Sequence, residues 1–198
     1  MIIGRILYPI TTLGPGNRLV IWTCGCSKHC SGCISPEWWE ATNGNYYDLT
    51  AGQLGETIER LIESQQPDGI TISGGDPLEQ ADELLDVLER ISKKCSDILV
   101  YTGFTLSELQ ANCDKANLRR LTDNTSVLID GRYEEALNDN KSPLRGSTNQ
   151  SIHFFNESLL DKYKLYMKEN GRTIQPVQID DQQILIGIFN KGGSSDAD

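Results

Sequence analysis

Basic residues are scarce in this chain. Lysine and arginine together number 18, against 28 aspartates and glutamates, which gives the 198 residues a formal net charge of −10. Proteins that bind nucleic acid need a basic footprint to meet the phosphates, so this balance argues against nucleic acid as a partner. It leaves a protein or a small cofactor as the expected ligand.

Long apolar runs are missing as well. No stretch approaches the roughly 20 residues that a membrane-spanning helix needs, and residues 1–5 are too briefly apolar for a signal peptide. We therefore expect a cytoplasmic protein with no membrane contact. No internal repeat or interdomain linker is evident, so residues 1–191 are predicted to form a single domain. The Gly-, Ser- and Asp-rich segment 192–198 is predicted to be a disordered tail.

A disulfide framework does not fit the cysteine pattern. Four of the six cysteines lie between Cys24 and Cys33, whereas Cys95 and Cys113 stand apart. That asymmetry favours a reducing compartment and a metal site over disulfide bonds.

Strand-like apolar segments alternate with helical segments along most of the chain. This order predicts a parallel sheet with helices outside it, and parallel α/β folds place their sites at the carboxyl ends of strands. We predict a single α/β domain built as an incomplete barrel. The predicted strands are 2–8, 18–22, 69–73, 97–102, 126–130 and 151–155; helices are predicted after Thr50 and Thr105 and over 78–93 and 159–169; and 173–179 with 183–189 is a predicted hairpin.

Cys26, Cys30 and Cys33 form a CxxxCxxC pattern, the most informative feature of the chain. Thiolates suit iron and sulfide, and three of them leave one iron of a four-iron cluster without a protein ligand. A cluster used only for electron transfer normally has four thiolates, so the open iron is expected to bind something else. Zinc is the alternative, because Cys24 extends the pattern to four thiolates that could close a tetrahedral site. A cysteine at a strand end is also typical of a small buried residue.

A glycine-rich segment, Ser73, Gly74, Gly75 and Asp76, begins 40 positions after Cys33, at the end of an apolar strand. Glycine lets the backbone approach a ligand closely and adopt conformations closed to other residues. The segment is therefore a candidate binding site. Considered alone, it would also fit an ordinary strand–helix turn.

Other strand ends carry further candidate binding residues. Tyr101 and Thr102 end one predicted strand; Asp130 ends another, and Arg132 lies two positions further on. An acid and a base at positions i and i+2 of a strand point the same way, toward a ligand with both carboxylate and hydroxyl groups. The alternative is an exposed turn, for which Asp-Gly is a common dipeptide. Asn149 lies in a run of small and amide residues that could bind adenosine or ribose, or could simply make a loop.

Together these motifs resemble the radical S-adenosylmethionine (SAM) superfamily. Their ordered set between residues 18 and 152 is similar to the activating proteins of anaerobic ribonucleoside-triphosphate reductase. Larger activators of glycyl-radical enzymes often insert a ferredoxin-like domain, and this chain has no cysteines for one. The motifs are I-W-x-x-G-C-x3-C-x2-C, S-G-G-D-P-L, Y-T-G-F-T, L-I-D-G-R-Y and G-S-T-N-Q.

The resemblance implies a fold and a cofactor set. The fold would be an incomplete (β/α) barrel of the radical SAM type, with a [4Fe–4S] cluster at the carboxyl ends of the strands. The three cysteines of the CxxxCxxC pattern would bind the cluster, and SAM would chelate the open iron. The glycine segment would contact the amino group of SAM, although Asp76 stands where the superfamily usually has Glu. Asp130 and Arg132 would correspond to an Asp-x-Lys sequence that contacts SAM in related activating enzymes.

The resemblance also implies a reaction, that of an oxidoreductase working under anaerobic conditions. A reduced flavodoxin or ferredoxin would supply one electron, SAM would be cleaved to methionine and a 5′-deoxyadenosyl radical, and this radical would take a hydrogen atom from a glycine of the partner reductase. No side-chain acid or base is needed, so no catalytic residue is predicted. The alternatives are the activation of another glycyl-radical enzyme, a small-molecule reaction like that of 7-carboxy-7-deazaguanine synthase, and a non-enzymatic zinc-binding module.

Overall fold

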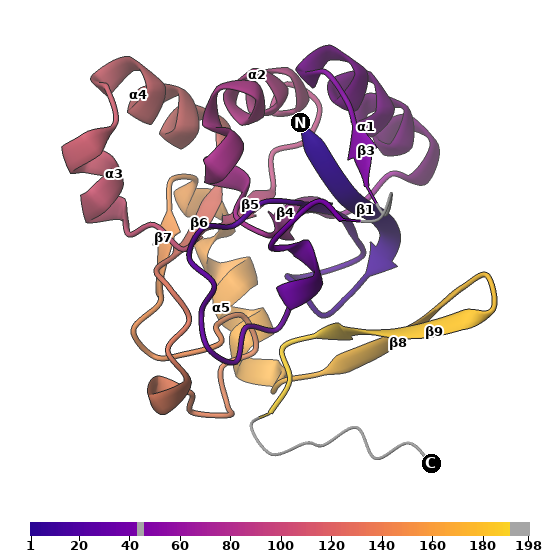
Figure 1. Cartoon of the computed structure of the whole chain (residues 1–198), viewed down its shortest axis with the longest axis vertical. Coiled ribbons are helices and arrows are strands. Elements are labelled where there is room, and N and C mark those ends of the chain that lie inside the picture. Colours follow the sequence, from indigo (N-terminus) through magenta and orange to yellow (C-terminus); the bar gives the residue numbers. More distant parts are fainter. Residues whose placement is uncertain (43–45, 191–198) are drawn as a thin grey trace.

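The computed structural model describes residues 1–42 and 46–190. The strands are β1 Ile2–Ile10, β2 Arg18–Thr23, β3 Tyr47–Asp48, β4 Gly69–Gly74, β5 Ile98–Tyr101, β6 Val127–Asp130, β7 Ser151–Phe154, β8 Ile174–Ile179 and β9 Gln182–Gly187. The helices are α1 Ala51–Gln65, α2 Ala81–Ile91, α3 Leu106–Asn112, α4 Lys115–Asn124 and α5 Leu160–Glu169. The described strands form one seven-stranded sheet of order β3-β1-β2-β4-β5-β6-β7 and a separate β8-β9 hairpin (Figure 1).

Side-chain caps set where the surface helices begin. Thr50 accepts a hydrogen bond from the backbone of Gln53, whose side chain bonds back to Thr50, so α1 starts with a capping box. Thr105 and Glu108 make the same arrangement at α3. Asp114 accepts hydrogen bonds from the first turn of α4. These caps satisfy amide groups that a helix start would otherwise leave unpaired.

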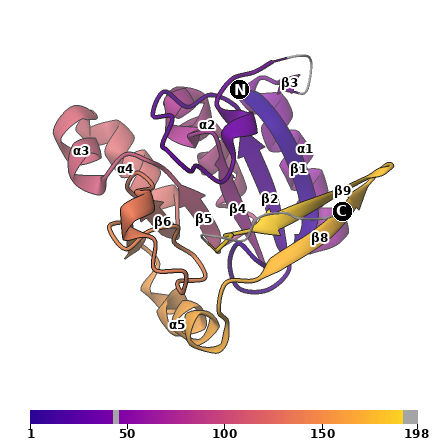
Figure 2. The same cartoon turned by 60° about the horizontal axis from the view of Figure 1, so that its bottom comes forward.

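The sheet has an apolar core on each face. Strand residues alternate between the two faces, because successive side chains of a strand point in opposite directions. One face packs against α1, α2 and α4, and its strand residues include Ile21, Ile72, Val100 and Leu128. The other face includes Val20 and Trp22 beneath the β8-β9 hairpin, and Leu99, Val127 and Ile129 beneath α5. Figure 2 shows the hairpin in front of the sheet, with α1 and α2 behind it.

The α/β class is confirmed, but the predicted strand directions are only partly correct. Strands β2, β4, β5 and β6 are parallel. Strands β1, β3 and β7 pair antiparallel to their neighbours, so the prediction of a parallel sheet is wrong at both edges. Residues 11–17 join β1 to β2 without a helix, and a parallel pair needs a crossover of roughly a dozen residues or more. Over residues 1–42 and 46–190 the strands form an open sheet and no closed barrel.

Two small elements were not predicted, while the C-terminal hairpin was. Strand β3 has two residues, too few for a sequence pattern. Helix α4 has Leu118 and Leu121 among mostly polar residues, so its apolar stripe is weak. The predicted hairpin is confirmed as β8 and β9. The predicted tail over 192–198 lies outside the described residues.

A buried ion cluster joins the amino-terminal ends of the parallel strands. Arg18, at the start of β2, is fully buried; it donates to Thr71 Oγ1 (2.6 Å) and lies 3.2 Å from Asp97 Oδ1. Asp97 also accepts hydrogen bonds from Lys162 Nζ and Tyr163 Oη, both at 2.7 Å. Burial acts to raise the pKa of Asp97, but Arg18 and these two donors outweigh it and hold that pKa below its ordinary value. The other end of β2 leads directly into the cysteine loop.

Candidate functional site

The three cysteines lie on the loop that follows the carboxyl end of β2. Cys26, Cys30 and Cys33 are half-buried, and none of them forms a disulfide. Backbone conformations with positive φ curl the loop: Gly25 has φ of 108°, His29 of 41° and Gly32 of 70°. The space that a side chain at Gly25 would enter is open. The loop therefore offers three free thiols on a tightly turned backbone.

A tryptophan pair anchors this loop. The backbone amides of Gly25 and Cys26 donate to the carbonyl oxygens of Trp38 (2.9 Å) and Trp39 (3.0 Å). The Trp38 ring is buried, and a side chain at Gly4 would lie 2.3 Å from it, so β1 can pass the ring only because residue 4 is glycine. The two tryptophans thus hold both ends of the cysteine loop against the sheet.

The glycine segment is bonded directly to the cysteine loop. The amide of Gly75 donates to Thr23 O (2.8 Å), and the amide of Asp76 donates to Gly25 O (2.7 Å). A Cβ atom at Gly75 would lie 2.3 Å from Gly25 O, closer than real side chains approach a carbonyl. Gly74 adopts a φ of 115°, which favours glycine. The two motifs predicted from the sequence therefore form one unit, and the glycines allow the close contact.

The side chain of Asp76 is engaged inside the protein. Its Oδ1 accepts hydrogen bonds from Leu78 N (3.1 Å) and Thr102 Oγ1 (2.8 Å). Its Oδ2 accepts from Gly103 N (2.9 Å) and lies 2.7 Å from Lys28 Nζ. Asp76 and Thr102, both predicted to bind SAM, are thus partners of each other beneath the cysteine loop. Direct contact of either side chain with a ligand stays a prediction.

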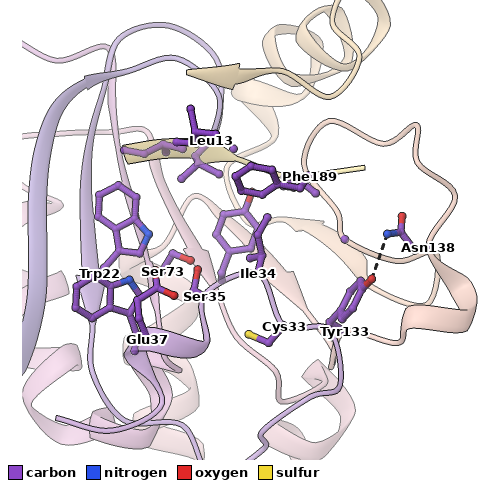
Figure 3. A pocket seen from close by; sticks show the side chains of 18 of the residues that line it. Leu13, Trp22, Cys33, Ile34, Ser35, Glu37, Ser73, Tyr133, Asn138 and Phe189 are labelled. Atoms are coloured by element: carbon purple, nitrogen blue, oxygen red, sulfur yellow. Dashed lines mark hydrogen bonds between the residues drawn. The ribbon is translucent and has the colours of Figure 1, made fainter. Parts of the chain in front are cut away.

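A cavity of about 350 Å³ opens beside Cys33 (Figure 3). This volume lies within the usual range of small-molecule sites. Trp22 and Ser73 are register partners on β2 and β4, and both line the cavity together with Tyr101 at the end of β5. The opposite wall comes from β9 and the segment after it. Other lining residues include Arg5, Ile34, Glu37, Tyr133 and Gln150.

Tyr101 holds the rim of the cavity. Its hydroxyl donates to Leu144 O (3.1 Å), and burial raises its pKa well above the ordinary tyrosine value. The phenol therefore stays protonated, and it fixes the loop around Leu144. Ser73 and Tyr101 are the predicted binding residues that line the cavity, and Cys33 is the predicted metal ligand that does so.

Asp130 is separated from Arg132 by the shape of the backbone. Asp130 is buried; it accepts hydrogen bonds from Leu106 N (2.5 Å) and Ser151 N (3.2 Å), and its Oδ2 lies 2.9 Å from His153 Nε2. Arg132 is exposed. Strand β6 ends at Asp130 and Gly131 has φ of 98°, so strand alternation does not continue to Arg132. The expectation that both side chains point the same way is therefore wrong.

Asn149 is exposed, and its amide donates to Arg132 O (2.8 Å) and Glu134 Oε1 (3.2 Å). It fastens two loops to each other. In the part of the chain that the structure describes, the cavity wall does not include Asp130, Arg132 or Asn149. Contact of these three residues with SAM stays a prediction.

Burial and neighbouring charges act on the cysteine thiols. Burial raises the pKa of Cys26; backbone hydrogen bonds from Lys28 and His29 lower it, the charge of Asp76 raises it, and the charge of Lys28 lowers it. Cys24 lies in the apolar cluster with Trp22 and Trp38, where burial raises its pKa. Cys24 is therefore a buried core residue, whereas the three loop cysteines are only half-buried.

Three free thiols at this spacing fit an iron–sulfur cluster. Within residues 1–42 and 46–190, no three Cys, His, Asp or Glu side chains gather closely enough for a single metal ion. Thiolates that bind different irons of one cluster are spread farther apart than the ligands of a single zinc ion. The three thiols are half-buried on this loop, the space for a side chain at Gly25 is open, and Cys33 lines the cavity.

The most informative residue that the sequence did not reveal is Lys28. It stands between two of the cysteines, a position that suggests a solvated loop lysine, and yet its side chain is only 4% exposed. Trp22, Tyr133 and the residues of β9 also line the cavity without having been predicted as site residues. Apolar strand residues carry no local signal that separates a cavity wall from a core.

The fold and the site define an α/β protein with one cysteine-rich centre at the end of its parallel strands. A family model described as a 4Fe-4S single cluster domain matches residues 12–153. Similar proteins named "Anaerobic ribonucleoside-triphosphate reductase-activating protein" occur in Escherichia coli K12, Haemophilus influenzae and phage T4. The E. coli protein is 34% identical over 152 residues, which cover 74% of this chain and 94% of that protein. The H. influenzae protein is 34% identical over 155 residues (75% and 95%), and the phage protein is 30% identical over 151 residues (74% and 90%).

The chain therefore belongs to the family of anaerobic ribonucleoside-triphosphate reductase-activating proteins, and it carries a 4Fe–4S cluster domain. None of the helices in the described residues is long and apolar enough to cross a membrane.

Proposed function

We propose that this protein cleaves SAM reductively at a [4Fe–4S] cluster held by Cys26, Cys30 and Cys33, and so generates a glycyl radical on an anaerobic ribonucleoside-triphosphate reductase. The observation that carries the proposal is the free thiol triplet beside a cavity of small-molecule size, in a chain of the activating-protein family. The bound cluster would supply the electron that divides SAM into methionine and a 5′-deoxyadenosyl radical.

The residues around the cavity would orient SAM and exclude water. Trp22 and Tyr101 give one wall an apolar surface, and Ser73 adds a hydroxyl at the end of β4. Gly74 and Gly75 bring the backbone close to the cysteine loop, which favours their predicted role near the amino group of SAM. We infer that the open sheet with its hairpin serves as the incomplete barrel of the radical SAM type.

The partner would supply the hydrogen atom. A 5′-deoxyadenosyl radical would take a hydrogen from the α-carbon of a glycine, which would give 5′-deoxyadenosine and leave the unpaired electron on the glycine. No proton transfer by a side chain is needed, so the chain would contribute binding and orientation only. A reduced flavodoxin or ferredoxin would deliver the electron.

Anaerobic reconstitution with iron and sulfide tests this proposal. The reconstituted protein is reduced with dithionite in the presence of SAM and the reductase, 5′-deoxyadenosine is measured by chromatography, and the glycyl radical is measured by electron paramagnetic resonance (EPR). We expect both products. A protein that takes up zinc and forms no cluster would refute the cluster assignment. A cluster-loaded protein that forms neither 5′-deoxyadenosine nor a glycyl radical with the reductase present would refute the proposed reaction.

Replacement of one loop cysteine sharpens the test. Cys30→Ala should abolish SAM cleavage while the circular dichroism spectrum stays unchanged, because the apolar cores do not include this residue. The matched control is Cys113→Ala, which removes an exposed cysteine at the end of α3 and should leave cleavage intact. Normal cleavage by Cys30→Ala would refute the cluster ligands named here.

A further inference from the structure

Lys28 carries a buried charge inside the cysteine loop. Its side chain is 4% exposed, although it stands between Cys26 and Cys30. An ammonium group taken out of water is costly unless charged or polar partners surround it. Its Nζ lies 2.7 Å from Asp76 Oδ2, 3.0 Å from Glu79 Oε1 and 3.4 Å from the centroid of the Phe104 ring. The ring adds a cation–π contact to the two ion pairs.

The partners of Lys28 come from two different strand ends. Asp76 and Glu79 follow β4, and Phe104 follows β5. A Cβ atom at Gly103 would lie 2.4 Å from Lys28 Cδ, so the lysine stem rests against the backbone after β5. One ammonium thus connects the loop after β2 to the segments after β4 and β5.

A second loop residue reinforces this connection. Ser27 Oγ donates to Glu79 Oε1 (2.6 Å), the same oxygen that Lys28 contacts. Asp76 is held in turn by Thr102 and Gly103. The result is a continuous polar network that includes two residues of the cysteine loop, Ser27 and Lys28.

We propose that Lys28 is a positioning residue that locks the cysteine loop onto the Gly74–Asp76 segment and offsets the two carboxylates beside the cluster. This inference rests on the proposed function, since it concerns the same centre. With Lys28 present, the three charged groups sum to −1; without it they would sum to −2. The charges lie close to the loop thiols, because Lys28 stands two positions after Cys26 and two before Cys30.

Charge near an iron–sulfur cluster changes its reduction potential. Additional negative charge disfavours addition of an electron, and additional positive charge favours it. Lys28→Met should therefore lower the midpoint potential of the cluster. Asp76→Asn should raise it, because the same three groups would then sum to zero. The double variant Lys28→Met/Asp76→Asn should return the potential close to that of the parent protein.

The experiment measures the cluster potential of each reconstituted variant by EPR-monitored redox titration, and 5′-deoxyadenosine formation in parallel. Lys28→Met removes the contacts with Asp76 and Glu79 that hold the cysteine loop in place. We expect SAM cleavage by this variant to fall on the order of 10²-fold, the loss that a misplacement of about 1 Å can cause. Lys28→Arg should recover part of it, because the charge returns with a different shape. The control is Lys94→Met, which removes an exposed lysine paired with Glu63 on the helical face and should change neither quantity.

Opposite shifts in Lys28→Met and Asp76→Asn would support the inference. If Lys28→Met takes up no cluster, Asp76→Asn decides the matter: a raised potential supports the inference and an unchanged one overturns it. Potentials and cleavage equal to those of Lys94→Met in both variants would overturn the positioning role while the proposed function stands. A parent protein that holds no cluster would instead refute the proposed function itself.

Discussion

The contact between Gly75 and the cysteine loop makes a sharp prediction for Gly75→Ala. The added Cβ would lie 2.3 Å from Gly25 O and 2.6 Å from Trp38 O, and both atoms belong to the backbone. Flexible side chains could turn away, but these carbonyls are fixed by hydrogen bonds. Because Gly75 is absent from the described glycines with positive φ, the effect of the substitution is steric.

The magnitude follows from overpacking. One methylene forced into a well-packed region typically costs about 1–3 kcal/mol. For a chain of this size, a change of 1 kcal/mol moves the melting temperature by roughly 2–4 °C, so we expect a fall of about 2–12 °C. The loop must move away from β4 to relieve the contact, so the reconstituted variant should also bind less iron per chain.

The assay compares thermal unfolding of the metal-free protein with iron content after reconstitution. The matched control is Gly52→Ala in α1, where the nearest atom to an added Cβ is Thr50 Oγ1 at 3.8 Å. That change should be neutral or stabilising, because alanine restricts the unfolded chain and favours a helix. If Gly75→Ala melts and binds iron as the parent protein does, the two motifs are not in the contact described above.

Two further predictions concern the ion cluster at the other end of the sheet. Arg18→Met should destabilise the protein by about 3–5 kcal/mol in urea unfolding, because it removes one partner of a buried ion pair. Equal urea midpoints for the variant and the parent protein would contradict this. The control is Arg119→Met, which removes a largely exposed arginine on α4. Folding lowers the pKa of Asp97 below its value in the unfolded chain, which is about 4. The ionised carboxylate therefore stabilises the folded protein fully above about pH 4. This stabilisation is lost as the pH falls through the lower pKa of the folded state. Asp97→Asn should therefore flatten the stability profile below about pH 4, and an unchanged slope there would refute the assignment.

Much of the fold could be predicted because apolar segments and turn residues repeat along the chain. The strands β2, β4, β5 and β6 all lie where the sequence placed a short apolar run. The direction of β1 and β7 could not be read in the same way, because direction depends on how neighbouring strands are connected. Helix α4 was missed because it packs through few apolar residues, Leu121 being the buried one.

The site was predicted less completely than the fold. The spacing of Cys26, Cys30 and Cys33 and the glycines after β4 are local signals, and the structure brings those segments together. A shared direction of the Asp130 and Arg132 side chains was expected from strand alternation, and the strand ends before that alternation reaches Arg132. The burial of Lys28 depends on residues of two distant segments, so no local pattern could show it.

The hairpin that closes the cavity has a consequence for biosynthesis. Ile186 and Ile188 pack in one cluster with Val20 and Trp22, and Thr12 donates to Ile186 O across 174 positions of the chain. A ribosome releases the cysteine loop and the parallel strands first, so this wall can dock only after they have emerged. During translation the three cysteines therefore emerge before the residues that form this wall. The predicted metal ligands are thus synthesised before the β9 residues that line the cavity beside them.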